Sequence, residues 1–161
     1  MSRTANAKQS EQPEGLEGPE LMFADLDGLL GYRLRRAQGA MHRDYVAAVA
    51  GLDLTQKQTA TLWLIHGNAG VSQVSVAAAL GMDRATMMSL VDRLEERRLV
   101  IRKRSTVDRR RQELYATPAG QSMLRKVKSR IAAHEARITS MFKPAELAAL
   151  LAALQKFQDV L

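Results

Sequence analysis

Three consecutive arginines, Arg109 to Arg111, stand in a turn between two short segments that alternate apolar and polar residues. Three adjacent guanidinium groups cannot be buried together, because each would lose its water with no opposite charge to replace it. Segments 99–103 and 112–116 are predicted to be strands, so the turn at 104–111 joins them into a hairpin. A basic turn on a hairpin is suited to gripping the phosphates of a nucleic-acid duplex.

The positive charge of the chain is concentrated around this turn. The net charge is +7, yet the segment from Arg84 to Arg130 holds fourteen Lys and Arg against five Asp and Glu, an excess of +9. The rest of the chain carries −2. Localised positive charge steers a protein towards polyanions, so the segment is predicted to bind one. The alternative interpretation of the segment is a solvated basic surface with no partner.

Two short helices joined at Gly81 are predicted directly before the hairpin. Ser72 is expected to cap a helix that reaches Leu80, and Asp83 to cap a second helix that reaches Arg98. This is the pattern of a helix-turn-helix, whose second helix offers its polar face to base edges in the major groove. The pattern alone is common among packed helix pairs, and the basic hairpin after it strengthens the prediction.

Longer helices flank this central unit. Apolar residues recur at three- and four-residue spacing in 21–50, in 118–142 and in 144–161, and Thr55 is expected to cap a helix that reaches His66. We therefore expect a mainly α-helical fold with one small β-hairpin. Residues 1–20 are rich in Glu, Gln, Pro, Gly and Ser and are predicted to be a disordered tail.

Several classes of protein do not fit this composition. The chain has no cysteine, which excludes disulfides and thiol oxidation sensors, and it has no apolar run or leader typical of a membrane or secreted protein, so we expect a cytoplasmic location. The sequence contains no Gly-rich phosphate loop, no carboxylate pair and no nucleophile motif, so nothing in it suggests an enzyme. His42, His66 and His134 lack the spacing of metal ligands, and we expect no metal and no cofactor.

Taken in order, these pieces resemble the MarR family of bacterial transcriptional regulators. The resemblance covers residues 21–161, and its motifs are Leu54-Thr55, Gly81-Met82-Asp83-Arg84-Ala85-Thr86, Leu90-Val91-Asp92-Arg93-Leu94-Glu95, Arg102, Asp108-Arg109-Arg110 and Thr117-Pro118-Ala119-Gly120.

The resemblance implies a homodimeric winged helix-turn-helix regulator. Segments 21–50 and 121–161 would form a helical dimerisation lobe, and 53–118 the DNA-binding lobe. Such a dimer would bind a pseudo-palindromic operator as a repressor and be released by a small effector. The alternative is an architectural protein that coats double-stranded DNA without sequence preference.

The resemblance also assigns residues to the DNA contact. Arg84, Thr86 and Ser89 would face the bases, and Ser72 and Gln73 the phosphates. In the wing, Arg109 and Arg110 would enter the minor groove and Arg111 would contact phosphate. Asp108 would order the wing by pairing with Arg110, or be an ordinary turn residue.

Two positions depart from the family pattern. Arg98 stands where a glycine is usual, so either the turn is built differently or Arg98 adopts a strained φ angle. Met88 and Ser89 replace longer polar side chains, which leaves more of the base reading to Arg84, Thr86 and DNA shape.

Many members bind an aromatic acid or related anion and then bind DNA less tightly. Arginine pairs with carboxylate or phosphate, and Tyr, His and Trp can flank an aromatic ring. The candidate ligand-binding residues are Tyr32, Arg33, Arg36, His42, Trp63 and His66.

Segment 31–38 further resembles regulators of hydroxycinnamate catabolism, some of which respond to the coenzyme A thioester of the acid. Extra arginines would suit the phosphates of such a ligand. The alternative is that Tyr32 and Trp63 are core or interface residues and that the arginines are solvated.

Overall fold

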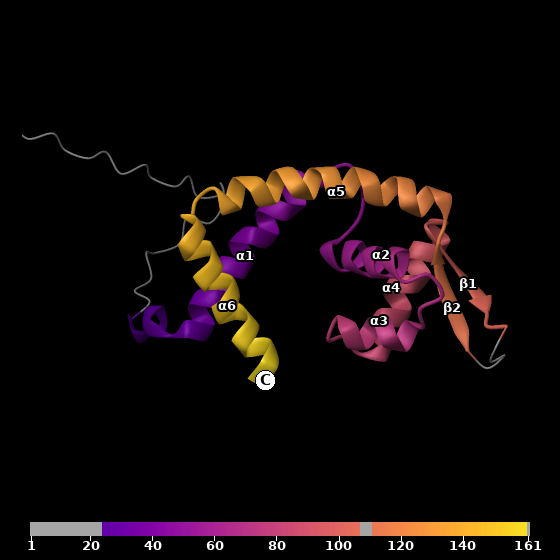
Figure 1. Ribbon diagram of the computed structural model, residues 1–161, viewed down its shortest axis with the longest axis horizontal. Helices are drawn as coiled ribbons and strands as arrows, with labels where there is room; N and C mark the ends of the chain where they lie inside the picture. The colour runs from indigo at the N-terminus through magenta and orange to yellow at the C-terminus, as the bar shows by residue number, and fades with distance from the viewer. Residues whose placement is uncertain (1–23, 107–110, 161) are drawn as a thin grey trace, which may run out of the picture. The chain divides into compact units, whose positions relative to one another are not determined.

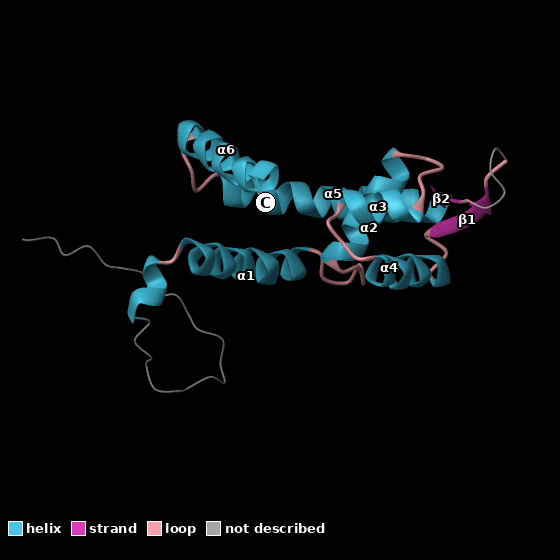
Figure 2. Cartoon of the chain, turned by 90° about the horizontal axis from the view of Figure 1, so that it is seen from below, coloured by secondary structure: helices cyan, strands magenta, loops and turns pink. Residues whose placement is uncertain are grey.

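The computed structural model describes residues 24–106 and 111–160, which are mainly helical with one antiparallel hairpin, as predicted (Figures 1 and 2). The elements in chain order are the 3-10 helix η1 (Ala24–Gly28), then α1 (Leu30–Ala48), α2 (Gln56–Gly67), α3 (Gln73–Ala79), α4 (Arg84–Glu96), β1 (Val100–Arg104), β2 (Gln112–Ala116), α5 (Pro118–Thr139) and α6 (Pro144–Val160). The chain divides into two units between Ala37 and Gln38, inside α1.

The predicted helix over 21–50 is wrong at its start. The structure has η1, a break at Leu29, and only then α1. Asp27 lies in η1 just before the break, and its backbone carbonyl accepts from Arg33 Nε at 2.6 Å while its side chain accepts from Arg36 Nη1 at 3.4 Å. Gly28, which disfavours helix interiors, ends η1 beside it. These local interactions outweigh the apolar periodicity of the segment.

Side-chain caps start the four helices that follow α1, because each satisfies backbone N–H groups that have no partner in the first turn. Thr55 forms a capping box with Gln58, and Ser72 and Asp83 accept from the backbone N–H groups of Ser75 and Thr86. Thr117 caps α5, with proline in the first turn. The predicted caps at Thr55, Ser72 and Asp83 are confirmed, and α5 begins at Pro118 as predicted.

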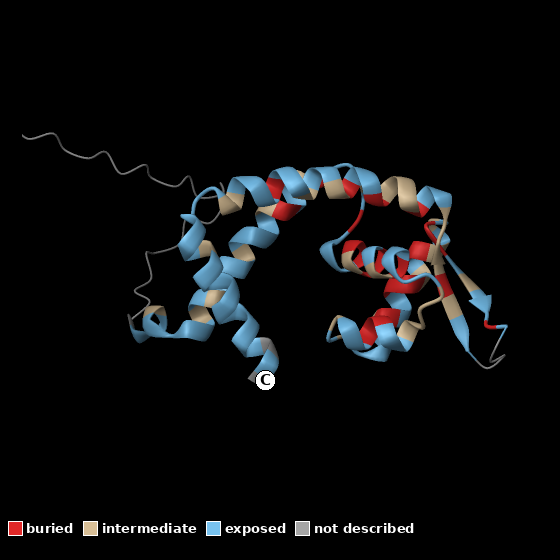
Figure 3. Ribbon diagram, viewed as in Figure 1, coloured by how far each residue is buried: buried red, intermediate tan, exposed pale blue. Residues whose placement is uncertain are grey.

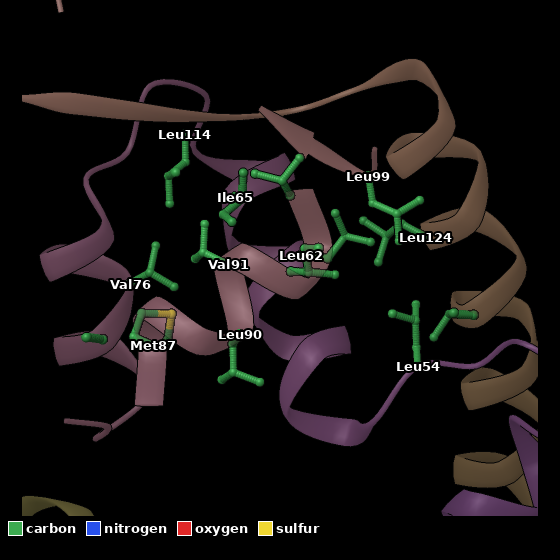
Figure 4. Close-up of a cluster of buried hydrophobic side chains, with 14 residues drawn as sticks. Leu54, Leu62, Ile65, Val76, Met87, Leu90, Val91, Leu99, Leu114 and Leu124 are labelled. Carbon is green, nitrogen blue, oxygen red and sulfur yellow. The ribbon is translucent and has the colours of Figure 1, made fainter. Parts of the chain in front are cut away.

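A single apolar core holds α2, α3, α4 and the hairpin together, and the start of α5 closes it (Figure 4). Its centre is formed by side chains that are completely excluded from solvent, namely Leu62, Ile65, Met87, Val91, Leu94, Val100 and Val127. We call residues 53–118 together with the start of α5 the winged unit. Burial of these apolar side chains supplies its main stabilisation.

A backbone bridge joins the hairpin to the segment before α3. Val71 forms an isolated bridge with Leu114, which extends the two-stranded sheet by one short segment.

Arg98 adopts a φ of +56°, so the position where glycine is usual keeps its left-handed turn at a cost in strain. The alternative of a differently built turn is therefore not what the structure shows.

Helix α6 differs from the winged unit, because none of its described side chains is buried (Figure 3). Its apolar residues Leu150, Leu151, Leu154 and Phe157 are between 37% and 58% exposed. Within the described ranges, no single helix is long and apolar enough to cross a membrane; α3 and α4 pass that test only as a pair bent by 115°.

Candidate nucleic-acid interface

The first two turns of α4 present one face to solvent. Arg84 and Ser89 are exposed, and Met88 between them is 53% exposed. The opposite face of the helix, with Met87, Leu90, Val91 and Leu94, is buried in the core. The polar face predicted for this helix is therefore exposed, while its apolar stripe is buried.

Asp83 fixes the geometry of the first turn of α4. Its carboxylate accepts from the backbone N–H of Thr86 at 2.8 Å and from the Thr86 hydroxyl at 2.6 Å. The hydroxyl bond, followed by the backbone bond, holds the pKa of Asp83 below its ordinary value, because both bonds favour the charged carboxylate. Because the Thr86 proton is committed to Asp83, Thr86 can offer a DNA base an acceptor oxygen and a methyl group.

The start of α3 and the outer end of the wing share one hollow. Ser72, Gln73, Val74, Arg111 and Gln112 line this hollow, whose volume is about 410 Å³. The structure thus brings together three of the predicted DNA-contact residues, Ser72, Gln73 and Arg111. Asp108, Arg109 and Arg110 lie outside the described residues, so their predicted roles stay predictions.

Arg102 on β1 ties the wing to α4. Its guanidinium bonds to the Asp92 carboxylate at 2.5 Å and to the Glu95 carboxylate, and its backbone N–H donates to Glu95 at 3.2 Å. It also donates to the Gln73 side chain of α3 at 3.4 Å. The Arg102 side chain is 18% exposed, so these ion pairs are partly shielded from solvent.

These bonds of Arg102 give the wing a defined position relative to α4, whose polar face is exposed. Arg102 appeared in the sequence as part of the family pattern, but its partners could not be read from it. One local signal existed, since Asp92 and Glu95 stand three residues apart and therefore share a face of α4. The contact of Gln73 with Arg102 also means that Gln73 positions the wing besides lying at the predicted phosphate site.

Further cations and a small hydrogen-bond network lie on the hairpin. Lys103 and Arg104 are exposed on β1, in addition to the residues predicted from the sequence. Glu113 on β2 accepts from the Ser105 and Tyr115 hydroxyls, which, with the charge of Arg111, keep its pKa below the ordinary value. The Lys103 ammonium lies 5.1 Å from the centre of the Tyr115 ring. The described part of the wing therefore has a basic surface, and hydrogen bonds and a cation–π contact stabilise it.

A second kind of site lies between the end of α1, α2 and α5. A cavity of about 210 Å³ is lined there by Met41, Tyr45, Gln56, Thr59, Ala60, Trp63, Ile131, His134 and Glu135. Trp63 is 40% exposed, and the Lys128 ammonium lies 4.2 Å from the centre of its ring. Aromatic, apolar and polar side chains thus meet in a space sized for one aromatic ring system.

The other predicted ligand residues are distributed over both units. His42 bonds to the Gln56 side chain at 3.2 Å, and His66 is exposed near the end of α2 and lies outside the lining of this cavity. Tyr32, Arg33 and Arg36 belong to the first unit, where both arginines bond to Asp27. Their predicted role in ligand binding stays a prediction.

A polar cluster beside the cavity joins α1 to α5. Buried His134 bonds through Nδ1 to the Asp44 carboxylate at 2.6 Å, and Arg137 bonds to the same carboxylate. Tyr45 packs edge-on against His134 and donates to Thr59 at 2.9 Å. The Arg137 hydrogen bond, followed by that of His134, lowers the pKa of Asp44 below its ordinary value. His134 therefore joins α1 to α5 through its bond to Asp44 and its contact with Tyr45.

Comparison with known proteins agrees with this geometry. A family model described as MarR family matches residues 51–111. The putative transcriptional regulatory protein for the hcr operon of Thauera aromatica is 29% identical over 150 residues, which cover 92% of this chain and 90% of that protein.

Solved structures extend the similarity over the whole fold. The transcriptional repressor CouR bound to a 23-mer DNA duplex is 36% identical, with a TM-score of 0.81, over 86% of this chain and 99% of that one. CouR bound to p-coumaroyl-CoA is 34% identical, with a TM-score of 0.82, over 88% of this chain and 100% of that one. These relatives confirm the prediction of a transcriptional regulator rather than an enzyme, and this chain belongs to the MarR family of transcriptional regulators.

Proposed function

We propose that this protein is a homodimeric repressor that binds a pseudo-palindromic operator and releases it on binding an aromatic acyl-CoA. The observation that carries the DNA part is the free polar face of α4 beside a wing anchored to it by Arg102. A helix end and a basic hairpin in fixed relation can occupy a major groove and the neighbouring minor groove. CouR, at 36% identity, is a repressor bound to a DNA duplex.

The residue roles follow the predicted set. Arg84 and Ser89 would reach base edges from the exposed face of α4, and Thr86 would accept from a base or contact a thymine methyl group. Ser72, Gln73 and Arg111 would line the phosphate path along the hollow between α3 and the wing. Arg109 and Arg110 would enter the minor groove.

Dimerisation would use the helical segments outside the winged unit. Helix α6 exposes a row of leucines, and Met141 and Phe142 just before it are 70% and 36% exposed. In the first unit, Leu26, Leu29 and Leu30 are each about half exposed or more. Clustered exposed apolar side chains on a helix mark an association surface, and a second copy of the chain would supply matching apolar faces. We therefore assign 21–50 and 121–161 to the dimer and 53–118 to DNA binding.

The effector would place its aromatic ring in the cavity beside Trp63. The cavity volume of about 210 Å³ fits a hydroxycinnamoyl group, whereas the coenzyme A part would extend outside it. CouR, at 34% identity over its full length, is the repressor bound to p-coumaroyl-CoA. Ligand binding lowers operator affinity only if the ligand favours a state that binds DNA less well.

The DNA part is tested by selection of duplexes from a random pool with the wild-type protein, followed by footprinting. We expect a discrete protected site with two related half-sites. Uniform coverage without a selected sequence would favour an architectural protein that coats DNA, and would contradict the proposal. Salt dependence does not separate the two, because both use phosphate contacts.

The effector part is tested by titrating the protein–operator complex with p-coumaroyl-CoA, feruloyl-CoA and the free acids. We expect the thioesters to raise the operator Kd by about 10-fold or more, within the usual range of allosteric coupling. Trp63→Ala should weaken ligand binding while it preserves operator binding without ligand. The absence of any response to all four compounds would overturn this part of the proposal.

A further inference from the structure

The short link between α1 and α2 runs past the C-terminal end of α4. Two of its residues adopt left-handed backbone angles, Gly51 with a φ of +79° and Asp53 with a φ of +52°. Glycine adopts such angles freely, but for aspartate they carry a cost that surrounding contacts must offset. The link is therefore held in a conformation that it would not adopt by itself.

Arg97 supplies those contacts. This residue is the C-cap of α4, and its guanidinium donates through Nη2 to the Leu52 carbonyl at 3.3 Å and through Nη1 to the Asp53 carbonyl. The Asp53 carboxylate lies 3.9 Å from the same guanidinium, but it is 93% exposed, so the two carbonyl bonds are the stronger constraint. A planar guanidinium can bond two successive carbonyls only while the link keeps this shape.

A cavity of about 630 Å³ lies at this junction. Its walls come from the end of α1, the link, the start of α2 and the end of α4, where Arg93 and Arg97 line it. Tyr45 and Gln56 line both this cavity and the smaller one beside Trp63. Open space on one side of Arg97 allows the link to move relative to α4, as close packing would not.

We infer that Arg97 is a positioning residue that transmits the occupancy of the Trp63 cavity to α4. The path runs from Tyr45 and Gln56, through the link, to the last turn of the helix that reads DNA. A ligand that displaces the start of α2 would strain the two carbonyl bonds and tilt α4, which lowers operator affinity. This inference rests on the proposed effector response.

The test compares Arg97→Gln with Arg93→Gln. Both substitutions remove one positive charge from the same helix and the same cavity, but Arg93 makes no side-chain bond to another described residue. The readout is the ratio of operator Kd with and without p-coumaroyl-CoA, measured by fluorescence anisotropy. We expect Arg93→Gln to keep the wild-type ratio and Arg97→Gln to lower it at least 5-fold, while calorimetry shows that Arg97→Gln still binds the thioester.

A merely structural role would shift both Kd values of Arg97→Gln in parallel and leave the ratio unchanged, which would overturn the inference. If circular dichroism shows that Arg97→Gln is unfolded, Arg97→Lys replaces it. Lysine keeps the charge, but its ammonium lacks the planar fork that reaches both carbonyls, so the ratio should again fall.

A second readout separates failure of the inference from failure of the proposed effector. Coupling is reciprocal, so operator binding should slow amide hydrogen exchange in the link around Leu52 and Asp53 without any ligand. We expect this protection in the wild type and in Arg93→Gln, and its loss in Arg97→Gln. If p-coumaroyl-CoA has no effect on the wild type but this pattern appears, only the identity of the effector is wrong. If the wild-type link gains no protection, the inference fails.

Discussion

The winged unit and helix α6 contain similar apolar residues but bury them to very different extents. In the winged unit Leu62, Met87 and Leu114 are at most 1% exposed, whereas on α6 Leu151 is 58% exposed and Leu150 is 39% exposed (Figure 3). The winged unit closes its core with helices and strands of its own chain. The winged unit thus buries its apolar side chains within its own chain, whereas α6 keeps an apolar face exposed, which we propose is covered by a second copy of the chain.

Leu62→Ala should cause the largest loss of unfolding free energy among the variants considered. Its side chain is fully buried at the centre of the core, so its truncation leaves a cavity and should cost about 2–5 kcal/mol of unfolding free energy. Urea denaturation of the purified protein measures the loss. Leu151→Ala on α6 is the matched control and should cost far less. Equal losses at the two positions would mean that the two regions do not differ as described.

The double variant Leu151→Glu, Leu154→Glu tests the exposed apolar face of α6. Two carboxylates on the exposed face of α6 would disfavour its association with a second chain, and loss of the paired lobe should weaken operator binding about 100-fold. Analytical ultracentrifugation and anisotropy measure the two effects. Lys156→Glu makes the same change in net charge on exposed α6 and should leave both properties near wild type. A double variant that still sediments as a dimer contradicts the assignment.

Arg102→Met should separate stability from wing position within the winged unit. It leaves Asp92 and Glu95 facing each other without their shared cation. Because these carboxylates are 47% and 39% exposed, the expected loss is only about 1–2 kcal/mol, below that of a fully buried pair. Operator binding should weaken further than stability alone explains, since the wing loses its anchor. Unchanged operator affinity in a folded variant would show that the anchor does not position the wing for DNA.

The smallest expected effect concerns pH and the polar contact between α1 and α5. The pKa of Asp44 is lowered in the folded protein, chiefly by Arg137 and then by His134. A carboxyl group with a lowered pKa stabilises the fold above its ordinary pKa of about 4, and this contribution is lost as the pH falls through the lower, folded value. Thermal melting between about pH 6 and 3 should therefore fall less steeply for Asp44→Asn than for the wild type. Identical slopes would exclude a contribution from Asp44.

Much of the fold followed from short-range patterns in the sequence. Caps at Thr55, Ser72, Asp83 and Thr117 were predictable because each acts on a backbone N–H only three residues away. The buried stripe of α4 followed from its spacing alone. The break before α1 was missed, because its cause is a set of bonds to Asp27 that periodicity does not reveal.

The candidate site divides in the same way. The exposed face of α4 and the basic hairpin could be predicted, since exposure and charge follow from residue type and order. The anchor that joins Arg102 to Asp92, Glu95 and Gln73 could not, because it joins residues from three elements. The Arg97 contact with the link spans 44 residues and gave no local signal.

The starts of helices α2 to α6, their apolar faces and the concentration of positive charge around the hairpin follow from the amino-acid sequence. These properties depend on residue type and on neighbours within one or two turns of a helix. Packing between distant segments, in contrast, selects which cation meets which carboxylate, gives Arg98 its left-handed turn and places Trp63 beside a cavity. Those outcomes depend on contacts between residues far apart in the chain, whose distances are fixed only when the core has packed.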